Sequence, residues 1–150
     1  MTTQTAAGLS IRVHSRAALE SPLFVPKGNH GVISFYTPGD SKPRFPWATR
    51  RTLFAFQTCF DDIYGPMEGR RPIDQNQARW VAEALLRYLP RINRLYIHCD
   101  AGISRSSGCA AAISEFLFGD PGEFVPGDRF MPNPLVKRLV LEELRALSGR

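Results

Sequence analysis

The residues from 99 to 105 have types and a spacing that suit phosphoryl chemistry. Cys99 opens a short loop and Arg105 closes it. The backbone N–H groups of such a loop, with the N-terminus of a following helix, can bind a tetrahedral dianion. The same positive field should hold Cys99 as a nucleophilic thiolate, and the planar guanidinium of Arg105 can take two phosphoryl oxygens at once. The candidate phosphate-binding residues are Asp100, Ala101, Gly102, Ile103, Ser104 and Arg105.

The surroundings of this loop make the pattern more specific than the Cys-x5-Arg spacing, which could arise by chance. His98 precedes the cysteine, and Gly102 lets the backbone turn tightly towards a ligand. Ser106 follows the arginine, where its hydroxyl can reach the sulfur. An apolar segment comes before the loop and an alanine-rich segment after it. We therefore take Cys99, Arg105 and Ser106 as candidate catalytic residues.

The segment His98-Cys-Asp-Ala-Gly-Ile-Ser-Arg-Ser106 resembles the phosphate-binding signature of the protein tyrosine phosphatases and is closest to the dual-specificity type. Phe60-Asp-Asp-Ile63 and Pro132-Asn-Pro134 are similar to segments of small bacterial and phage-encoded tyrosine phosphatases, so the resemblance covers about residues 31 to 148. It implies that Cys99 forms a cysteinyl-phosphate and that His98 is an orienting residue. It also implies an aspartic acid that protonates the leaving oxygen and then activates water.

Two adjacent aspartates, Asp61 and Asp62, are the candidates for this general acid. They lie on a loop after a strand that we expect beside the strand of the nucleophile. We prefer Asp62, because the Asp-Ile pair resembles the bacterial group. Asp74 is nearer to Cys99 in the sequence, but it precedes a helical pattern and is better explained as an N-cap. Asp100 should point its side chain outward, because a carboxylate inside the loop would repel phosphate.

Hydrophobic patterns place the loop within an alternation of strands and helices. A strand, a crossover helix and a second strand imply parallel pairing. We expect one domain over residues 1–150, of the α/β class, with a mostly parallel sheet of about four strands flanked by helices. The patterns predict strands at 11–14, 31–36, 52–57 (buried) and 95–98, and helices at 74–89, 106–118 and from 133 onward.

Composition narrows the class of protein further. A 150-residue chain with 43% hydrophobic residues can bury a core of its own. The net charge of +5 favours anionic partners, but the basic residues are scattered, so we expect no nucleic acid partner. No apolar run is long enough to span a bilayer, and Met1 to Ser10 lacks the features of a signal peptide. We expect a cytoplasmic monomer with no membrane partner.

The other cysteines and the aromatic residues have less specific roles. Three cysteines are an odd number without metal-ligand spacing, so we expect neither a disulfide framework nor a metal or other cofactor. Cys59 and Cys109 are better explained as core residues than as redox partners of Cys99, and a Cys59–Cys99 disulfide is a minor alternative. Phe45 and Trp47 either line a substrate cleft or anchor their loop, and the sequence leaves both open.

The substrate class follows from the loop composition. Phosphoinositide phosphatases of this superfamily often carry lysines between the cysteine and the arginine, whereas this loop has none. We therefore expect a phosphorylated protein as the partner, with phosphotyrosine as the substrate and phosphoserine or phosphothreonine left open. Two alternatives are a non-catalytic phosphoprotein-binding module and a rhodanese-like or arsenate-reductase-like cysteine enzyme.

Overall fold

A four-stranded parallel sheet organises the chain in the computed structural model, which describes residues 8–149. Residues 1–7, where most of the segment tested for a signal peptide lies, are outside this range. The strand order is β1-β4-β2-β3, and β4 is a central strand with β1 and β2 on its two sides. The predicted α/β fold with about four parallel strands is confirmed. The strands are β1 (Ser10–Ser15), β2 (His30–Tyr36), β3 (Thr52–Cys59) and β4 (Arg94–Cys99).

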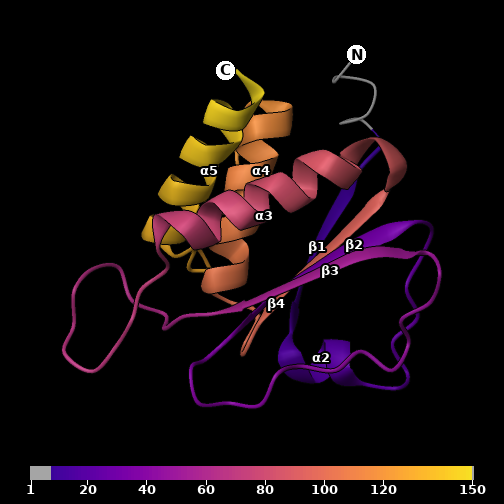
Figure 1. Cartoon of the computed structure of the whole chain (residues 1–150), viewed down its shortest axis with the longest axis horizontal. Helices are drawn as coiled ribbons and strands as arrows, with labels where there is room; N and C mark the ends of the chain where they lie inside the picture. The colour runs from indigo at the N-terminus through magenta and orange to yellow at the C-terminus, as the bar shows by residue number, and fades with distance from the viewer. Residues whose placement is uncertain (1–7, 150) are drawn as a thin grey trace.

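Three long helices pack together on one side of the sheet, and a short helix lies with the connecting loops on the other side (Figure 1). Each long helix begins where the sequence offers a cap or a suitable first residue. The predicted helices over 106–118 and from 133 onward are present, and the first amphipathic helix ends at Tyr88. The helices are α2 (Arg16–Glu20), α3 (Gln75–Tyr88), α4 (Arg105–Phe118) and α5 (Pro134–Ser148), with a 3-10 turn at Leu89–Arg91.

Asp74 is the N-cap of α3, as the sequence predicted. Its carboxylate accepts a hydrogen bond from the backbone N–H of Gln77, and the Gln77 side chain in turn accepts one from the backbone N–H of Asp74. This reciprocal pair is a capping box, which satisfies two backbone donors at the start of the helix. Asp74 is therefore explained by the fold, and the general-acid candidates reduce to Asp61 and Asp62.

Two expectations about the elements are wrong, and one helix was not predicted. The strand β3 is an edge strand with half-buried residues, whereas we expected it to be buried. It pairs only with β2, which separates it from β4, so the aspartate loop does not leave a strand beside that of Cys99. The helix α2 was not predicted, because five residues contain too little periodicity. Ser15 caps this helix by accepting a hydrogen bond from the N–H of Ala18.

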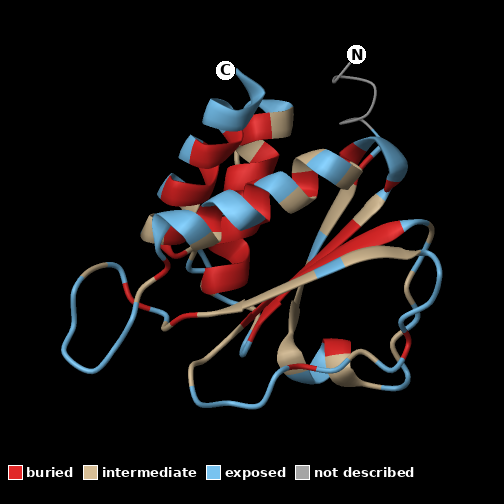
Figure 2. Ribbon diagram, viewed as in Figure 1, coloured by how far each residue is buried: buried red, intermediate tan, exposed pale blue. Residues whose placement is uncertain are grey.

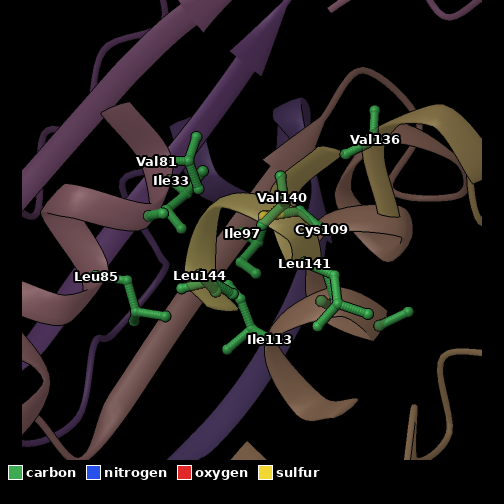
Figure 3. Packing of buried hydrophobic residues seen from close by; sticks show 14 of the residues in the cluster. Ile33, Val81, Leu85, Ile97, Cys109, Ile113, Val136, Val140, Leu141 and Leu144 are labelled. Atoms are coloured by element: carbon green, nitrogen blue, oxygen red, sulfur yellow. The ribbon is translucent and has the colours of Figure 1, made fainter. Parts of the chain in front are cut away.

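The main core lies between the sheet and the three long helices. Helix α4 is buried along most of its length, since β4 lies on one side of it and α5 on another (Figure 2). Cys109 of α4 packs among aliphatic side chains that include Ile97 of β4 and Val140 of α5 (Figure 3). Small residues in α4 permit this close approach, and at Gly108 a Cβ atom would lie 2.6 Å from the carbonyl oxygen of Asn133. The loop before α4 is therefore held by a fully packed helix.

Candidate active site

The candidate site is the turn where β4 ends at Cys99 and α4 begins at Arg105. Among the described residues, the backbone N–H groups of 101–104 have no hydrogen-bond acceptor. Ser104 occupies the N-cap position of α4 but makes no side-chain capping bond. The first turn of the helix and the loop thus present free donors at one place, which is an arrangement that binds anions. The predicted anion-binding loop has this geometry.

Gly102 fixes the path of the loop. Its φ angle is +72°, a left-handed conformation that glycine adopts without the strain of a side chain. A Cβ atom here would lie 2.7 Å from the carbonyl carbon of His14 and 2.8 Å from the backbone nitrogen of Ser15. The loop therefore lies directly against the end of β1, and the absence of a side chain is what permits this contact.

The sulfur of Cys99 is buried beneath the loop next to a hydroxyl group. Its Sγ lies 3.0 Å from the Oγ of Ser106, in the first turn of α4. A hydroxyl at this distance can donate a hydrogen bond to a thiolate. The structure thus brings together Cys99 and Ser106, two of the residues that the sequence singled out.

Arg105 ends this turn as the first residue of α4, and its residue surface is only 4% exposed. Its Nη1 donates to the carbonyl oxygen of Phe60 at 2.7 Å, and its Nη2 lies 3.2 Å from a carboxylate oxygen of Asp100. Its Nε is the one buried side-chain donor or acceptor atom among the described residues that has no hydrogen-bond partner. Burying such a donor is costly unless a ligand accepts its hydrogen bond.

Asp100 lies at the rim of the loop, in contact with Arg105. Its side chain is 44% exposed, yet the Oδ2 atom turns to Arg105 and also accepts a hydrogen bond from the Thr37 hydroxyl at 2.8 Å. The backbone carbonyl of Asp100 accepts a further bond from the N–H of Arg16. The carboxylate avoids the interior of the loop, as expected, but it remains at the rim because the guanidinium attracts it. Thr37 gave no sequence signal for this role.

The two aspartates after β3 have different surroundings. Asp62 reaches the loop, since its Oδ1 accepts a hydrogen bond from the Ser104 hydroxyl at 2.8 Å. Asp61 turns towards its own loop, where its Oδ2 accepts a bond from the backbone N–H of Arg71. The segment that carries them extends away from the body of the molecule between β3 and α3 (Figure 1). Of the two candidates, Asp62 is the one in contact with the anion-binding loop.

Asn133 is a site residue whose contact with Asp62 our sequence reasoning did not predict. Its Oδ1 caps α5 by accepting from the N–H groups of Leu135 and Val136. Its Nδ2 donates to Asp62 Oδ1 at 2.8 Å and to the carbonyl of Ile63. Asn133 therefore joins the aspartate loop to the start of α5. The Pro-Asn-Pro resemblance was a signal at this position, but no spacing connected it with Asp62.

His98 is fully buried behind the nucleophile. Its Nε2 lies 2.7 Å from the Ser34 hydroxyl, and its Nδ1 lies 3.1 Å from the carbonyl oxygen of Cys99. Burial is the main cause that lowers the pKa of His98, and the nearby Arg16 adds to this, while the bond to the Cys99 carbonyl acts in the opposite direction. A neutral ring can donate through Nδ1 and accept from Ser34. This pair of bonds fixes the ring beneath the loop.

The remaining candidates lie away from the loop. Trp47 is buried and donates through its indole nitrogen to the carbonyl of Leu19, so it anchors its loop. Phe45 contacts both Trp47 and the His98 ring. Cys59 and Cys99 are unpaired in the structure. Since β2 separates their strands by roughly 10 Å, a disulfide between them would require the backbone to move. No metal-ligand cluster occurs among the described residues.

This chain has a parallel sheet whose central strand passes through a Cys-x5-Arg loop into a buried helix, and it shares its fold with solved structures of PTPMT1. A solved structure of PTPMT1 in complex with PI(5)P matches with a TM-score of 0.57, 16% identity and coverage of 94% of each chain. Another PTPMT1 structure matches with a TM-score of 0.50 and 20% identity, over 80% of this chain and 78% of that one. No known family model and no curated protein matches the sequence.

Proposed function

We propose that this protein is a phosphatase that hydrolyses phosphotyrosine in proteins through a cysteinyl-phosphate intermediate. One observation carries the proposal. The free N–H groups of 101–104 and the unpartnered Nε of buried Arg105 lie at the same turn as the Cys99 sulfur. These donors can bind the oxygens of a phosphoryl group while the thiolate lies in line to attack its phosphorus. Such donors stabilise negative charge as it develops in the transition state.

The first chemical step transfers the phosphoryl group to the enzyme. The Cys99 thiolate forms an S–P bond while the P–O bond to the tyrosyl oxygen breaks. Asp62, entering this step protonated, gives its proton to the leaving phenolate. The contact of Asp62 with Ser104 supports this role, because it holds the carboxyl beside the loop that binds the phosphate. Arg105 stabilises the charge on the equatorial oxygens.

The second step releases inorganic phosphate. The carboxylate of Asp62 takes a proton from a water molecule, whose oxygen attacks the phosphorus as the S–P bond breaks. The Cys99 thiolate leaves, and the Ser106 hydroxyl at 3.0 Å from the sulfur can stabilise the charge that returns there. Asp62 is protonated again, so that the cycle balances without a metal ion or another cofactor.

The rim of the loop favours a substrate of low negative charge. The Asp100 carboxylate lies beside Arg105, and no lysine occurs between Cys99 and Arg105. A second or third phosphate near this carboxylate would be repelled. PTPMT1 was solved in complex with PI(5)P, so a phosphoinositide is the alternative to be tested. The charge at Asp100 is our reason for preferring a phosphotyrosyl protein.

A substrate panel tests this choice. Hydrolysis of a phosphotyrosyl peptide, a phosphoseryl peptide of the same sequence and PI(5)P is compared by phosphate release at equal concentrations. We expect the highest kcat/KM for the phosphotyrosyl peptide, by about tenfold or more over PI(5)P. A higher kcat/KM for PI(5)P would contradict the proposed substrate but leave the cysteine mechanism intact. The absence of turnover on all three, with binding retained, would instead favour the non-catalytic binding module.

A further inference from the structure

A second cavity lies on the sheet face opposite the long helices, and one of its lining residues, His14, lies with its backbone against Gly102 of the Cys99 loop. Its volume is about 270 Å³, and it is formed by β1, β4 and the segment between α2 and β2. Arg12 pairs with Tyr96 in the β1–β4 register, and both line the cavity. The mechanism proposed above uses none of its residues.

The charge of this cavity is uniformly positive. Arg12, Lys27 and Arg94 line it, and no acidic residue does. Among the described residues, no ion pair neutralises any of these three side chains. Another hollow, of about 490 Å³, differs because its lining includes Glu20. Three unpaired cations around a small concave surface are complementary to an anionic group.

The segment over this cavity is held firmly in place. Phe24 packs edge-on against His14 and Tyr96, with ring centroids 5.3 Å and 5.1 Å apart. The backbone N–H of Lys27 donates to the Tyr96 hydroxyl at 3.0 Å. The floor and the backbone of the cavity are therefore fixed by packing, and a ligand does not have to order them.

Two aliphatic side chains project from the same segment into solvent. Leu23 is 86% exposed and Val25 is 75% exposed, the highest values among the exposed large hydrophobic residues described. They alternate with the half-buried Phe24 ring, and Pro22 and Pro26 flank them and restrict the backbone. Apolar side chains that project fully, beside cations, suit insertion into the boundary between lipid headgroups and acyl chains. A peptide ligand would instead need a groove that covers these side chains.

We propose that this cavity and the tip formed by Leu23 and Val25 dock the protein on the surface of an anionic lipid membrane. The three cations bind a lipid phosphate group, and the two aliphatic side chains enter the headgroup boundary. This proposal departs from the expectation of no membrane partner, which rested on the lack of apolar runs long enough to span a bilayer; the described residues contain no helix able to span one. Peripheral docking needs no such helix. This inference extends beyond the proposed phosphatase activity and does not depend on it.

Vesicle sedimentation tests the inference. The protein is mixed with phosphatidylcholine vesicles that contain about 30% phosphatidylserine, and with pure phosphatidylcholine vesicles, at about 0.1 M salt. We expect binding to the anionic vesicles only. Arg12→Glu/Lys27→Glu should weaken binding at least tenfold, and Leu23→Ser/Val25→Ser should weaken it severalfold.

Matched control variants distinguish binding through this site from nonspecific electrostatic and hydrophobic binding. Arg87→Glu/Arg138→Glu makes the same charge change at exposed positions of α3 and α5, and Leu147→Ser removes an exposed aliphatic side chain elsewhere. These controls should bind as the wild type does. Circular dichroism checks folding independently of catalysis.

Three outcomes would overturn the proposal. One is a lack of binding to anionic vesicles. The second is an equal loss of binding in the control variants. The third is binding that depends on Arg12 and Lys27 but not on Leu23 and Val25. In this case soluble glycerophosphoserine, or an acidic peptide such as polyglutamate, would also abolish binding at a similar concentration of charge. That third result would assign the cavity to a free anion or to a protein segment.

Discussion

At the residue scale, the proposed chemistry depends on how Ser104 and Asn133 hold Asp62. Both donate hydrogen bonds of 2.8 Å to the same oxygen, Asp62 Oδ1. The other carboxyl oxygen is then the one free to carry and deliver a proton. Ser104 belongs to the anion-binding loop, so Asp62 is positioned relative to the bound phosphate itself. Asp61, bonded to Arg71, lacks any such link.

Removal of the Asp62 carboxyl should slow turnover strongly. We expect Asp62→Ala to lower kcat by roughly 10² to 10⁴, the usual contribution of a general acid. The loss should be larger for phenyl phosphate than for p-nitrophenyl phosphate, because the poorer leaving group needs the proton more. Steady-state kinetics with both esters measure this difference.

Asp61→Ala is the matched control for this prediction. It removes a neighbouring carboxylate from the same loop, which should change kcat by less than about tenfold and without dependence on the leaving group. A larger loss for Asp61→Ala than for Asp62→Ala would transfer the role of acid to Asp61. Equal sensitivity of both esters to Asp62→Ala would contradict proton donation by Asp62.

At the element scale, the site is positioned by β4 and α4, which the loop connects directly. The helix is held by the core through its buried face, and the strand is held by β1 and β2 on its two sides. The loop between them is pressed against the end of β1 at Gly102. The free N–H groups are therefore held in place by packed elements before a ligand binds. Donors that are preorganised in this way stabilise negative charge without having to reorient during the reaction.

A methyl group at Gly102 should disturb this junction. Gly102→Ala adds the strain of a left-handed conformation, about 1–2 kcal/mol, and a contact of 2.7 Å with the backbone of β1. We expect a fall in the free energy of unfolding of more than about 2 kcal/mol and a loss of most activity. Urea unfolding and p-nitrophenyl phosphate hydrolysis provide the two measurements.

Gly119→Ala provides the comparison, because Gly119 also has a positive φ but no atom of another segment lies near the position of an added Cβ. Its φ is +90°, and no heavy atom lies within 4 Å of the added Cβ. It should cost only the conformational strain of about 1–2 kcal/mol and leave kcat unchanged. If Gly102→Ala behaved like Gly119→Ala in both measurements, the contact with β1 would be irrelevant to the site.

At the scale of the whole molecule, burial of His98 couples stability to pH. Burial lowers its pKa below the ordinary value of 6.5, so the unfolded chain binds a proton more readily than the folded protein does. The resulting stabilisation is fully present above about pH 6.5 and is lost as the pH falls through the folded pKa. His14 shifts in the same direction, mainly by burial.

The free energy of unfolding should therefore decrease as the pH falls below about 6.5, with a slope of up to roughly 1.4 kcal/mol per pH unit for each proton. His98→Gln should reduce this slope, because glutamine does not titrate. Urea unfolding at several pH values measures it. An unchanged slope in His98→Gln would contradict the assignment to His98, and the same variant of His14 would then be the one to test.

The local structure of the candidate site could be predicted from the sequence because its parts are contiguous. Cys99, Gly102, Arg105 and Ser106 lie within one strand–loop–helix segment, and local patterns specify such segments. Asp74 was predicted as a cap for the same reason. The parallel α/β fold followed from the alternation of patterns along the chain.

Contacts between distant segments could not be predicted in this way. The position of β2 between β3 and β4 depends on which strands pack best on the helices, and no local pattern encodes it. The Thr37–Asp100 hydrogen bond and the Asn133–Asp62 hydrogen bond join residues 63 and 71 positions apart. The orientation of Asp100 depends on the attraction between its carboxylate and the guanidinium of Arg105. The spacing of the two residues in the sequence does not predict this contact.

The central claim is that Cys99 carries the phosphoryl group during turnover, and acid-quenched phosphoenzyme analysis tests it most directly. The protein is mixed with a phosphotyrosyl peptide in the presence of a chelator, quenched within the first turnovers, digested and analysed by mass spectrometry. We predict one phosphoryl group on the peptide that contains Cys99, present in Cys109→Ser and absent, together with all turnover, in Cys99→Ser. Phosphate release that persists in Cys99→Ser, or a phosphoryl group on another residue, would contradict the account.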